Sequence, residues 1–481
     1  MGHDSRLEYG VSRSARSKSC YPSNTCCGNP GTPLRCPAAR GTGIIEAGRL
    51  TSQTVLWSSC VVASRAGGDR MTLSDFDPRS PEVVACPEAY FAAMRSECPV
   101  HRDAETGVYS LARYDDVRGA AQRPNLFSSH RPIFGEGDPE LEAIQAEGFP
   151  EVPTLTPNDP PVHTRYRKLV NRAFSPKVVK DLEPAIKSII SGLIDNFADR
   201  GEVEFLSEFA ALVPGYVIAD ALGIDRRDQD KFMHWSDQIV ATITFVEGLS
   251  RAQQIEHKWG FVQFQHYFAK EIEKRRENPG TDMISDLVTA RVGGERPLDR
   301  DEILDLIRIF LVAGNETTAS WIGGTMRLLL ANPEVLAQVT ADRSLIPRML
   351  EESLRIISPS RWTTRTVELG AEPVAQVRGV EVPEGSRVRL LWNSANHDEA
   401  YYPDPETFDI HREGPGHMAF GHGVHLCIGA ALARAEARIA FEGILDRLTG
   451  LRLAIPHSEI HNRPMGGVNR LDVLPLTFET I

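Results

Sequence analysis

The chain lacks three features that would assign it to a specialised class of protein: a basic excess, a long apolar segment and an even spread of cysteines. Its 481 residues carry a formal net charge of −12, whereas broad nucleic-acid binding needs a basic surface. No run of about 18 apolar residues occurs, so the sequence predicts no membrane-spanning helix. With 41% hydrophobic and 25% charged residues, its composition is typical of a soluble globular protein.

Cysteine is scarce beyond residue 70: that part of the chain contains only Cys86, Cys98 and Cys427. Disulfide-stabilised folds are rich in cysteine and are typically secreted, whereas reduced cytoplasmic proteins are not. We therefore expect a cytoplasmic protein.

Residues 1–70 differ from the rest, with nine Lys/Arg against four Asp/Glu, abundant Ser, Gly and Pro, and no periodicity. Disorder is the simplest interpretation. A second hypothesis is that translation starts at Met71, because the codons for Gly67 to Arg70 could form a purine-rich ribosome-binding site. We expect one large domain at 71–481, preceded by a disordered or misassigned extension.

From Met71 onward the patterns predict a mainly α fold with a small, late β portion. Segment 128–157 is rich in Pro and Gly and is predicted to be an irregular, functional loop, clearest at Arg131–Pro139. Segment 367–391 is rich in Val, Glu and Gly and predicts strands. Apolar spacing near 3.6 predicts helices at 161–173, 176–199, 204–222, 226–247, 250–276, 282–292 and 299–331.

One cysteine lies in a tight loop, Phe420-Gly-His-Gly-Val-His-Leu-Cys427-Ile-Gly429, directly before an Ala-rich helical run at 430–448. Gly421 and Gly423 permit backbone conformations that other residues rarely adopt. The start of the following helix favours negative charge and is expected to lower the pKa of the thiol. Such a cysteine suits a thiolate that binds a metal; a buried structural cysteine is the alternative.

Glu316 and Thr317 interrupt an apolar run in the predicted helix 299–331. Burying a carboxylate and a hydroxyl costs several kcal/mol unless they are paired or hydrated. Gly314 costs about 1 kcal/mol more in helix propensity. The pattern predicts either a local distortion with a proton path, or a solvent-facing Glu316 with Thr317 bonded back to the Ala313 carbonyl.

His163 and Arg167 are spaced i, i+4, so they share a helix face and could hold an anionic group. Arg165 and Lys168 lie between and beside them, and non-specific solvation of a basic segment is the alternative interpretation.

Together and in this order, the motifs resemble those of the cytochrome P450 family of haem-thiolate monooxygenases, over about residues 85–480. The resemblance implies the cytochrome P450 fold, mainly α with a small β portion, in a single large domain. The matches are Phe420, Gly423, Cys427 and Gly429 to Phe-x-x-Gly-x-x-x-Cys-x-Gly, Glu352 and Arg355 to Glu-x-x-Arg, and Ala313–Thr318 to Ala-Gly-x-Asp/Glu-Thr-Thr.

The resemblance implies that Cys427 is the axial thiolate of the iron in haem b, iron protoporphyrin IX. It further implies that Glu316 and Thr317 pass protons to dioxygen. The two haem propionates need cations, and the matching positions are His163, Arg167, Arg365 and His425.

Glu352 and Arg355, with Arg412, resemble the family's structural ion network, which would brace the Cys loop. Of the two arginines in Arg361–Arg365, the distance from Ser358-Pro359 favours Arg365 as the propionate partner. Arg361 would then lie nearer the substrate pocket.

The chain is most similar to the bacterial members that lack a membrane anchor. That implies a monomer using O2, with electrons from NAD(P)H through a ferredoxin reductase and a ferredoxin, to hydroxylate or epoxidise a small apolar organic substrate. Arg434 and Arg438 would help to dock the ferredoxin, or are simply solvated.

Two other functions remain open at this point. One is a haem-thiolate enzyme that uses peroxide or isomerises its substrate, although Glu316 and Thr317 argue against it. The other is a non-catalytic recruitment module on the same fold.

Overall fold

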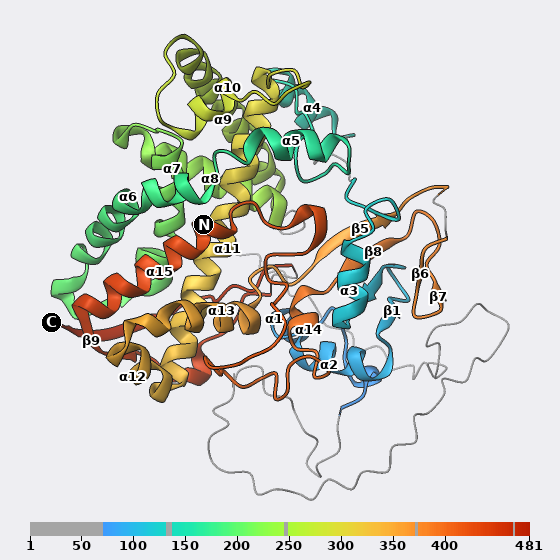
Figure 1. Cartoon of the computed structure of the whole chain (residues 1–481), viewed down its shortest axis with the longest axis vertical. Coiled ribbons are helices and arrows are strands. Elements are labelled where there is room, and N and C mark those ends of the chain that lie inside the picture. Colours follow the sequence, from blue (N-terminus) through green and yellow to red (C-terminus); the bar gives the residue numbers. More distant parts are fainter. Residues whose placement is uncertain (1–70, 131–136, 245–248, 371–373, 465–466) are drawn as a thin grey trace, which may run out of the picture.

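The computed structural model of the chain describes residues 71–130, 137–244, 249–370, 374–464 and 467–481. Helices fill the left and top of the view in Figure 1, and most strands gather on the right. The long helix α11 (Arg300–Ala331) runs down the middle between these two parts. The predicted fold class, mainly α with a small β portion, is confirmed.

The other α-helices follow the chain order shown in Figure 1. They are α1 (Pro81–Ala85), α2 (Glu88–Glu97), α3 (Tyr114–Ala121), α4 (Pro139–Ala146), α5 (Val162–Val170), α6 (Pro176–Asp195), α7 (Leu212–Ala221), α8 (Gln229–Thr244), α9 (Arg251–Glu277), α10 (Met283–Thr289), α12 (Pro333–Ala341), α13 (Ile346–Ile357), α14 (Trp392–Asn396) and α15 (Ala430–Arg447).

The strands form three sheets, ordered β1-β2-β8-β5-β3, β4-β10-β9 and β6-β7. The β2–β8 pair is parallel, with Tyr109 opposite Val388, and the other pairs are antiparallel. The strands are β1 (Val100–Arg102), β2 (Tyr109–Leu111), β3 (Phe127–Ser128), β4 (Glu202–Glu204), β5 (Thr363–Val367), β6 (Gln376–Val377), β7 (Val380–Glu381), β8 (Arg387–Leu390), β9 (Leu448–Leu453) and β10 (Pro475–Thr480).

Helix α11 begins where the sequence predicts. The Asp299 side chain accepts the Glu302 N–H at 2.9 Å, and the Glu302 carboxylate accepts the Asp299 N–H at 2.9 Å. This reciprocal cap satisfies amide groups that the first helical turn leaves unpaired. Apolar side chains such as Ile303, Leu306 and Ile322 are fully buried along the helix, so α11 forms the centre of the largest core cluster.

Two predictions of local structure are wrong. Segment 128–157 contains α4, because Asp138 caps it and Leu141 and Ile144 pack against Val262 of α9. The predicted helix 204–222 is divided into a π-helical turn at 206–210 and α7.

Some predictions concern residues outside the described ranges: all of 1–70, part of the loop at 131–136, and the end of the helix predicted at 226–247. In the part of the chain that the structure does describe, no helix combines the length and the apolar character needed to cross a bilayer.

Candidate active site

The loop that carries Cys427 is shaped by its glycines, as predicted. Gly421 and Gly423 have φ of 73° and 74°, in the left-handed region that favours glycine. A Cβ at Gly423 would lie 2.4 Å from the Ala121 carbonyl oxygen at the end of α3, so only glycine fits there. The Cys427 N–H donates to the Phe420 carbonyl at 2.9 Å and closes the loop.

The Cys427 side chain is exposed to solvent, although neighbouring protein atoms partly desolvate its sulfur. Burial is the largest influence and raises its pKa. The N–H groups of Gly429 and Ala430 and the charges of Arg167 and Arg434 act in the opposite direction and offset only part of this. The predicted lowering of the thiol pKa is therefore wrong for the protein without a bound cation, because desolvation exceeds the effect of the helix start.

Helix α11 is open on one side at its centre. Ala313 and Gly314 are exposed, although the residues at 309–311 are buried. A Cβ added to Gly314 would meet no atom within 4 Å. Four residues after Thr317, the Trp321 ring lies 6.2 Å from the Phe420 ring, centroid to centroid. The open stretch is thus about two turns from Trp321, where α11 meets the Cys loop.

Glu316 and Thr317 follow this open stretch and are both hydrogen-bonded. Each Glu316 carboxylate oxygen accepts from Arg470 Nη1 at 2.7 Å. The Thr317 hydroxyl donates to the Ala313 carbonyl at 2.8 Å. The predicted distortion of the helix is wrong, since Arg300–Ala331 is one continuous α-helix. The bonds to Arg470 and within the helix satisfy the polar groups without opening a turn.

The alternative interpretation of this motif is half right. Thr317 does bond back to Ala313, but the Glu316 side chain is only 12% exposed and is paired instead of solvated.

The predicted cationic residues gather around His163. Its ring lies 4.2 Å from the His425 ring, centroid to centroid, and Arg167 on the same helix donates to the Leu426 carbonyl at 2.7 Å. Burial, followed by the charges of His425, Arg167 and Arg365, lowers the pKa of His163 to about 4. His163 Nε2 is buried and has no hydrogen-bond partner among the described residues. Such an atom can bind an anionic group.

His425 is positioned by its own contacts. Its Nε2 lies 2.9 Å from the Ser129 hydroxyl and 3.8 Å from an Asp159 carboxylate oxygen.

The two arginines near β5 have different surroundings. Arg361 is fully buried and donates to the carbonyls of Val84 and Ala85 at 2.7 and 2.6 Å. Arg361 thus anchors the end of α1, and the expectation that it lies nearer the substrate pocket stays a prediction. Arg365 lies on β5 and contributes to the electrostatic environment of His163.

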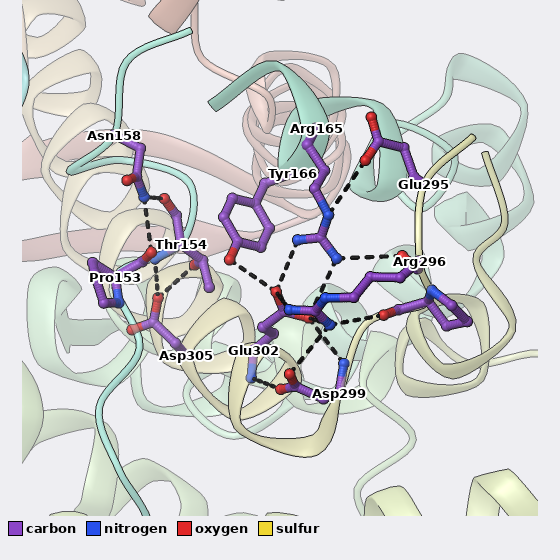
Figure 2. Close-up of polar contacts among 11 residues, drawn as sticks. Pro153, Thr154, Asn158, Arg165, Tyr166, Glu295, Arg296, Asp299, Glu302 and Asp305 are labelled. Carbon is purple, nitrogen blue, oxygen red and sulfur yellow. Dashed lines mark hydrogen bonds and ion pairs between the residues drawn. The ribbon is translucent and has the colours of Figure 1, made fainter. Parts of the chain in front are cut away.

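Helix α5 is tied to the start of α11 by a buried ion network that the sequence reasoning missed (Figure 2). The Glu302 carboxylate accepts from Arg165 at 2.8 Å, from the Tyr166 hydroxyl at 2.9 Å and from Arg296 at 2.8 Å. Burial opposes ionisation of Glu302, but these donors and the Asp299 N–H together lower its pKa. The alternative interpretation, that Arg165 is a solvated cation in a basic segment, is therefore wrong.

A second anchor lies beside the first (Figure 2). The Asp305 carboxylate, buried on α11, accepts from the Thr154 N–H at 3.0 Å and from the Thr154 hydroxyl. It holds the segment that leads into α5. Asp305 stands between Leu304 and Leu306 in the sequence, and this interruption of an apolar run was a signal that could have revealed it.

The predicted ion network of Glu352, Arg355 and Arg412 is present. Arg355 and Arg412 each donate through Nε to Glu352 at 2.9 Å. Arg355 also donates to the Asn396 carbonyl at 2.9 Å, and the Asn396 side chain accepts the Met418 N–H at 2.6 Å. The network thus braces the chain just before the Cys loop.

Arg434 and Arg438 of α15 are both engaged in ion pairs. Arg434 binds Glu351, with a shortest distance of 2.7 Å. Arg438 binds Glu183 at 2.6 Å and Glu442 at 3.0 Å. Neither is a simply solvated cation, and their part in docking stays a prediction.

The site thus places an accessible thiol in a rigid loop, with cationic side chains nearby and an acid–alcohol pair on the adjoining helix. These residues could hold an anionic cofactor whose metal ion accepts one thiolate ligand.

Comparison with known proteins agrees with this geometry. Residues 140–463 match the family model described as Cytochrome P450. The chain is 36% identical to the cyclomarin C epoxidase CymV of Salinispora arenicola, over 75% of this chain and 88% of that enzyme. It is 34% identical to a steroid C26-monooxygenase of Mycobacterium tuberculosis, over 80% of this chain and 98% of that enzyme.

Solved structures extend the similarity to three dimensions. The structure of cytochrome P450 CYP109Q5 from Chondromyces apiculatus matches with a TM-score of 0.74 and 34% identity, covering 84% of this chain and 98% of that one.

Proposed function

The chain belongs to the cytochrome P450 family, and from this premise we propose that it inserts one oxygen atom of O2 into a small apolar organic substrate, by hydroxylation or epoxidation. Membership makes it a monooxygenase with a haem-thiolate cofactor that acts with O2 and redox partners. The accessible thiol of Cys427, closed in its glycine loop beside the cationic residues, carries the proposal.

We assign haem b as the cofactor, and the chain's residues fit it. Cys427 would supply the thiolate, and the buried Nε2 of His163, which has no hydrogen-bond partner in the described part of the chain, suits a carboxylate. The propionates would be held by His163, Arg167, Arg365 and His425. No described atom lies within 4 Å of a Cβ placed at Gly314, so there is open space beside α11 at this point. When bound, the haem supplies the iron centre that activates dioxygen.

Glu316 and Thr317 are the proposed proton donors. The Thr317 hydroxyl donates a hydrogen bond to the Ala313 carbonyl, which leaves the lone pairs of its oxygen able to accept a hydrogen bond from a proton donor. Within the described residues, Arg470 is the side chain that holds Glu316, through both carboxylate oxygens. The carboxyl group can exchange these bonds for others. Together they would hold and pass protons at the open stretch of α11.

The substrate is proposed to be apolar because the side chains just before the open stretch of α11 are apolar. Ile309 is 7% exposed, Val312 is partly exposed and Ala313 is exposed. A steroid is a largely apolar molecule, so the similarity to a steroid C26-monooxygenase supports the same substrate class here.

We propose that electrons come from NAD(P)H through a ferredoxin reductase and a ferredoxin, and that the enzyme acts as a cytoplasmic monomer. Arg434 and Arg438 support ferredoxin docking, because they lie on the helix that follows the Cys loop and their ion pairs fix the guanidinium groups.

The test is the reduced carbon-monoxide difference spectrum, followed by O2 uptake with NAD(P)H and redox partners. We expect the wild type to give the thiolate-type band and Cys427→Ala to lose both the band and O2 activation. A wild type without that band would contradict the assignment of Cys427.

Thr317→Ala is expected to keep the band but divert reducing equivalents to hydrogen peroxide, whereas Thr317→Ser, which keeps the hydroxyl, should stay coupled. Equal coupling in the two variants would reject the proton role of Thr317.

A further inference from the structure

A compact charged group adjoins the Cys loop, formed by Glu351 of α13, Arg434 of α15 and His417. We call it the Glu351–Arg434 cluster. Arg434 makes a two-pronged ion pair with Glu351, Nε to Oε1 at 2.7 Å and Nη2 to Oε2 at 2.9 Å. His417 Nε2 lies 3.2 Å from the same carboxylate. Two parallel N–H···O bonds fix the orientation of a guanidinium group better than a single contact does.

The cluster is joined to the Cys loop through Phe420. The Arg434 guanidinium carbon lies 4.5 Å from the centroid of the Phe420 ring. The ring is also bounded by Trp321 at 6.2 Å and His417 at 6.1 Å, centroid to centroid. Because the Phe420 carbonyl accepts the Cys427 N–H, Arg434 is held against the same short segment that carries the sulfur.

Both members of the pair are charged at neutral pH. Burial opposes ionisation of Glu351, but the hydrogen bonds from Arg434 and His417 lower its pKa to about 2. The Arg434 charge in turn acts on the Cys427 sulfur, being one of the two cations that oppose the rise in the thiol pKa. The Arg434 cation therefore packs on Phe420 of the Cys loop, and the Glu351 anion is held against that cation.

We propose that Arg434 and Glu351 are positioning residues that set the reduction potential of the iron bound through Cys427, with Arg434 raising it and Glu351 offsetting that effect. This inference rests on the proposed role of Cys427. Reduction adds one electron to the iron, and no bond has to form or break. The iron–thiolate unit becomes more negative by one charge, so a nearby cation favours the reduced state and a nearby anion disfavours it.

The chain offers a matched control on the same helix. Arg438 lies one turn after Arg434 and is also paired with carboxylates, Glu183 and Glu442. Its guanidinium group is held by carboxylates of α6 and α15, whereas that of Arg434 packs on Phe420 of the Cys loop. Replacing Arg438 removes the same type of charge from the same helix.

The experiment is a dithionite titration of the purified haem-bound enzyme, followed by its absorption spectrum. For Arg434→Gln we expect the equilibrium constant for reduction to fall about tenfold, which is about 59 mV for one electron. Glu351→Gln should shift the potential in the opposite direction. The double variant should return towards the wild type, and Arg438→Gln should leave the potential unchanged.

A merely structural role gives a different pattern. If both single variants lower the potential, or if Arg438→Gln shifts it as much as Arg434→Gln, the inference is overturned. Arg434 and Glu351 are 44% and 43% exposed, so the Arg434→Gln shift should also shrink with added salt. A shift that is independent of salt would equally count against a charge effect.

The carbon-monoxide spectrum distinguishes a failure of the proposed function from a failure of the role assigned to the Glu351–Arg434 cluster. If the wild type lacks the thiolate-type band, the proposed function itself fails. If all variants keep the band and their potentials coincide, only the role of the Glu351–Arg434 cluster is rejected.

Discussion

Glu302 and Glu316 are carboxylates on the same helix, yet their surroundings differ. Glu302 is 1% exposed and accepts from Arg165, Arg296 and Tyr166. Glu316 lies about 21 Å further along the helix axis and has Arg470 as its partner, next to the open stretch at Gly314. A carboxylate that accepts from several donors holds the neighbouring segments in place. A carboxylate whose described partner is one arginine can change that partner more readily and can therefore pass a proton.

The largest expected difference between the two is in stability. Glu302→Ala removes the acceptor of four donor groups, those of Arg165, Tyr166 and Arg296 and the Asp299 N–H. It leaves Arg165, whose side chain is 16% exposed, with the longer ion pair to Glu295 at 3.5 Å. We expect a loss of about 3 kcal/mol in the free energy of unfolding, measured by urea denaturation of the haem-bound enzyme. Glu316→Ala should cost only about 1 kcal/mol. Equal losses would remove the distinction.

The next difference is in catalysis. Glu316→Gln keeps the shape of the side chain but cannot release a proton, so product formation should fall about 100-fold. O2 consumption and peroxide release would show where the electrons go. Glu302→Gln, measured alongside, should change product formation by less than about threefold, because no proton role is assigned to it. A comparable fall in both variants would contradict the proposed roles.

The smallest expected difference is in stability at low pH. The pKa of Glu302 is lower in the folded protein than the value of about 4.3 in an unfolded chain. Its contribution to stability is therefore complete above that unfolded value and is lost as the pH falls through the folded pKa. Below pH ~4.3 the wild type should lose up to about 1.4 kcal/mol per pH unit more than Glu302→Gln. Parallel unfolding curves between pH 5 and 3 would show that Glu302 does not contribute.

The features that could be predicted from the sequence are set by residues close to one another in the chain. The cap at Asp299, the long helix and the left-handed glycines of the Cys loop follow from spacing and backbone conformation within a few residues. The ion pair of Glu352 and Arg355 is similarly close in sequence.

What the sequence could not predict depends on distant partners. Arg470 is 154 residues from Glu316, and Arg165 is 137 residues from Glu302. Nothing in the local pattern around Arg165 distinguishes a solvated arginine from a paired one, because tertiary packing determines which carboxylate it meets. The pKa of Cys427 was misjudged for the same reason, since the burial of the thiol is set by the whole fold.

The close approach of Gly423 to the Ala121 carbonyl has a consequence for directed evolution. Libraries that randomise the Cys loop to change electron transfer should keep codon 423 fixed, since a Cβ there would lie 2.4 Å from a backbone oxygen of α3. That oxygen belongs to the main chain, so no neighbouring substitution can make room for a larger residue. Variation at Val424 and Leu426, which are 38% and 48% exposed, offers the more permissive starting points.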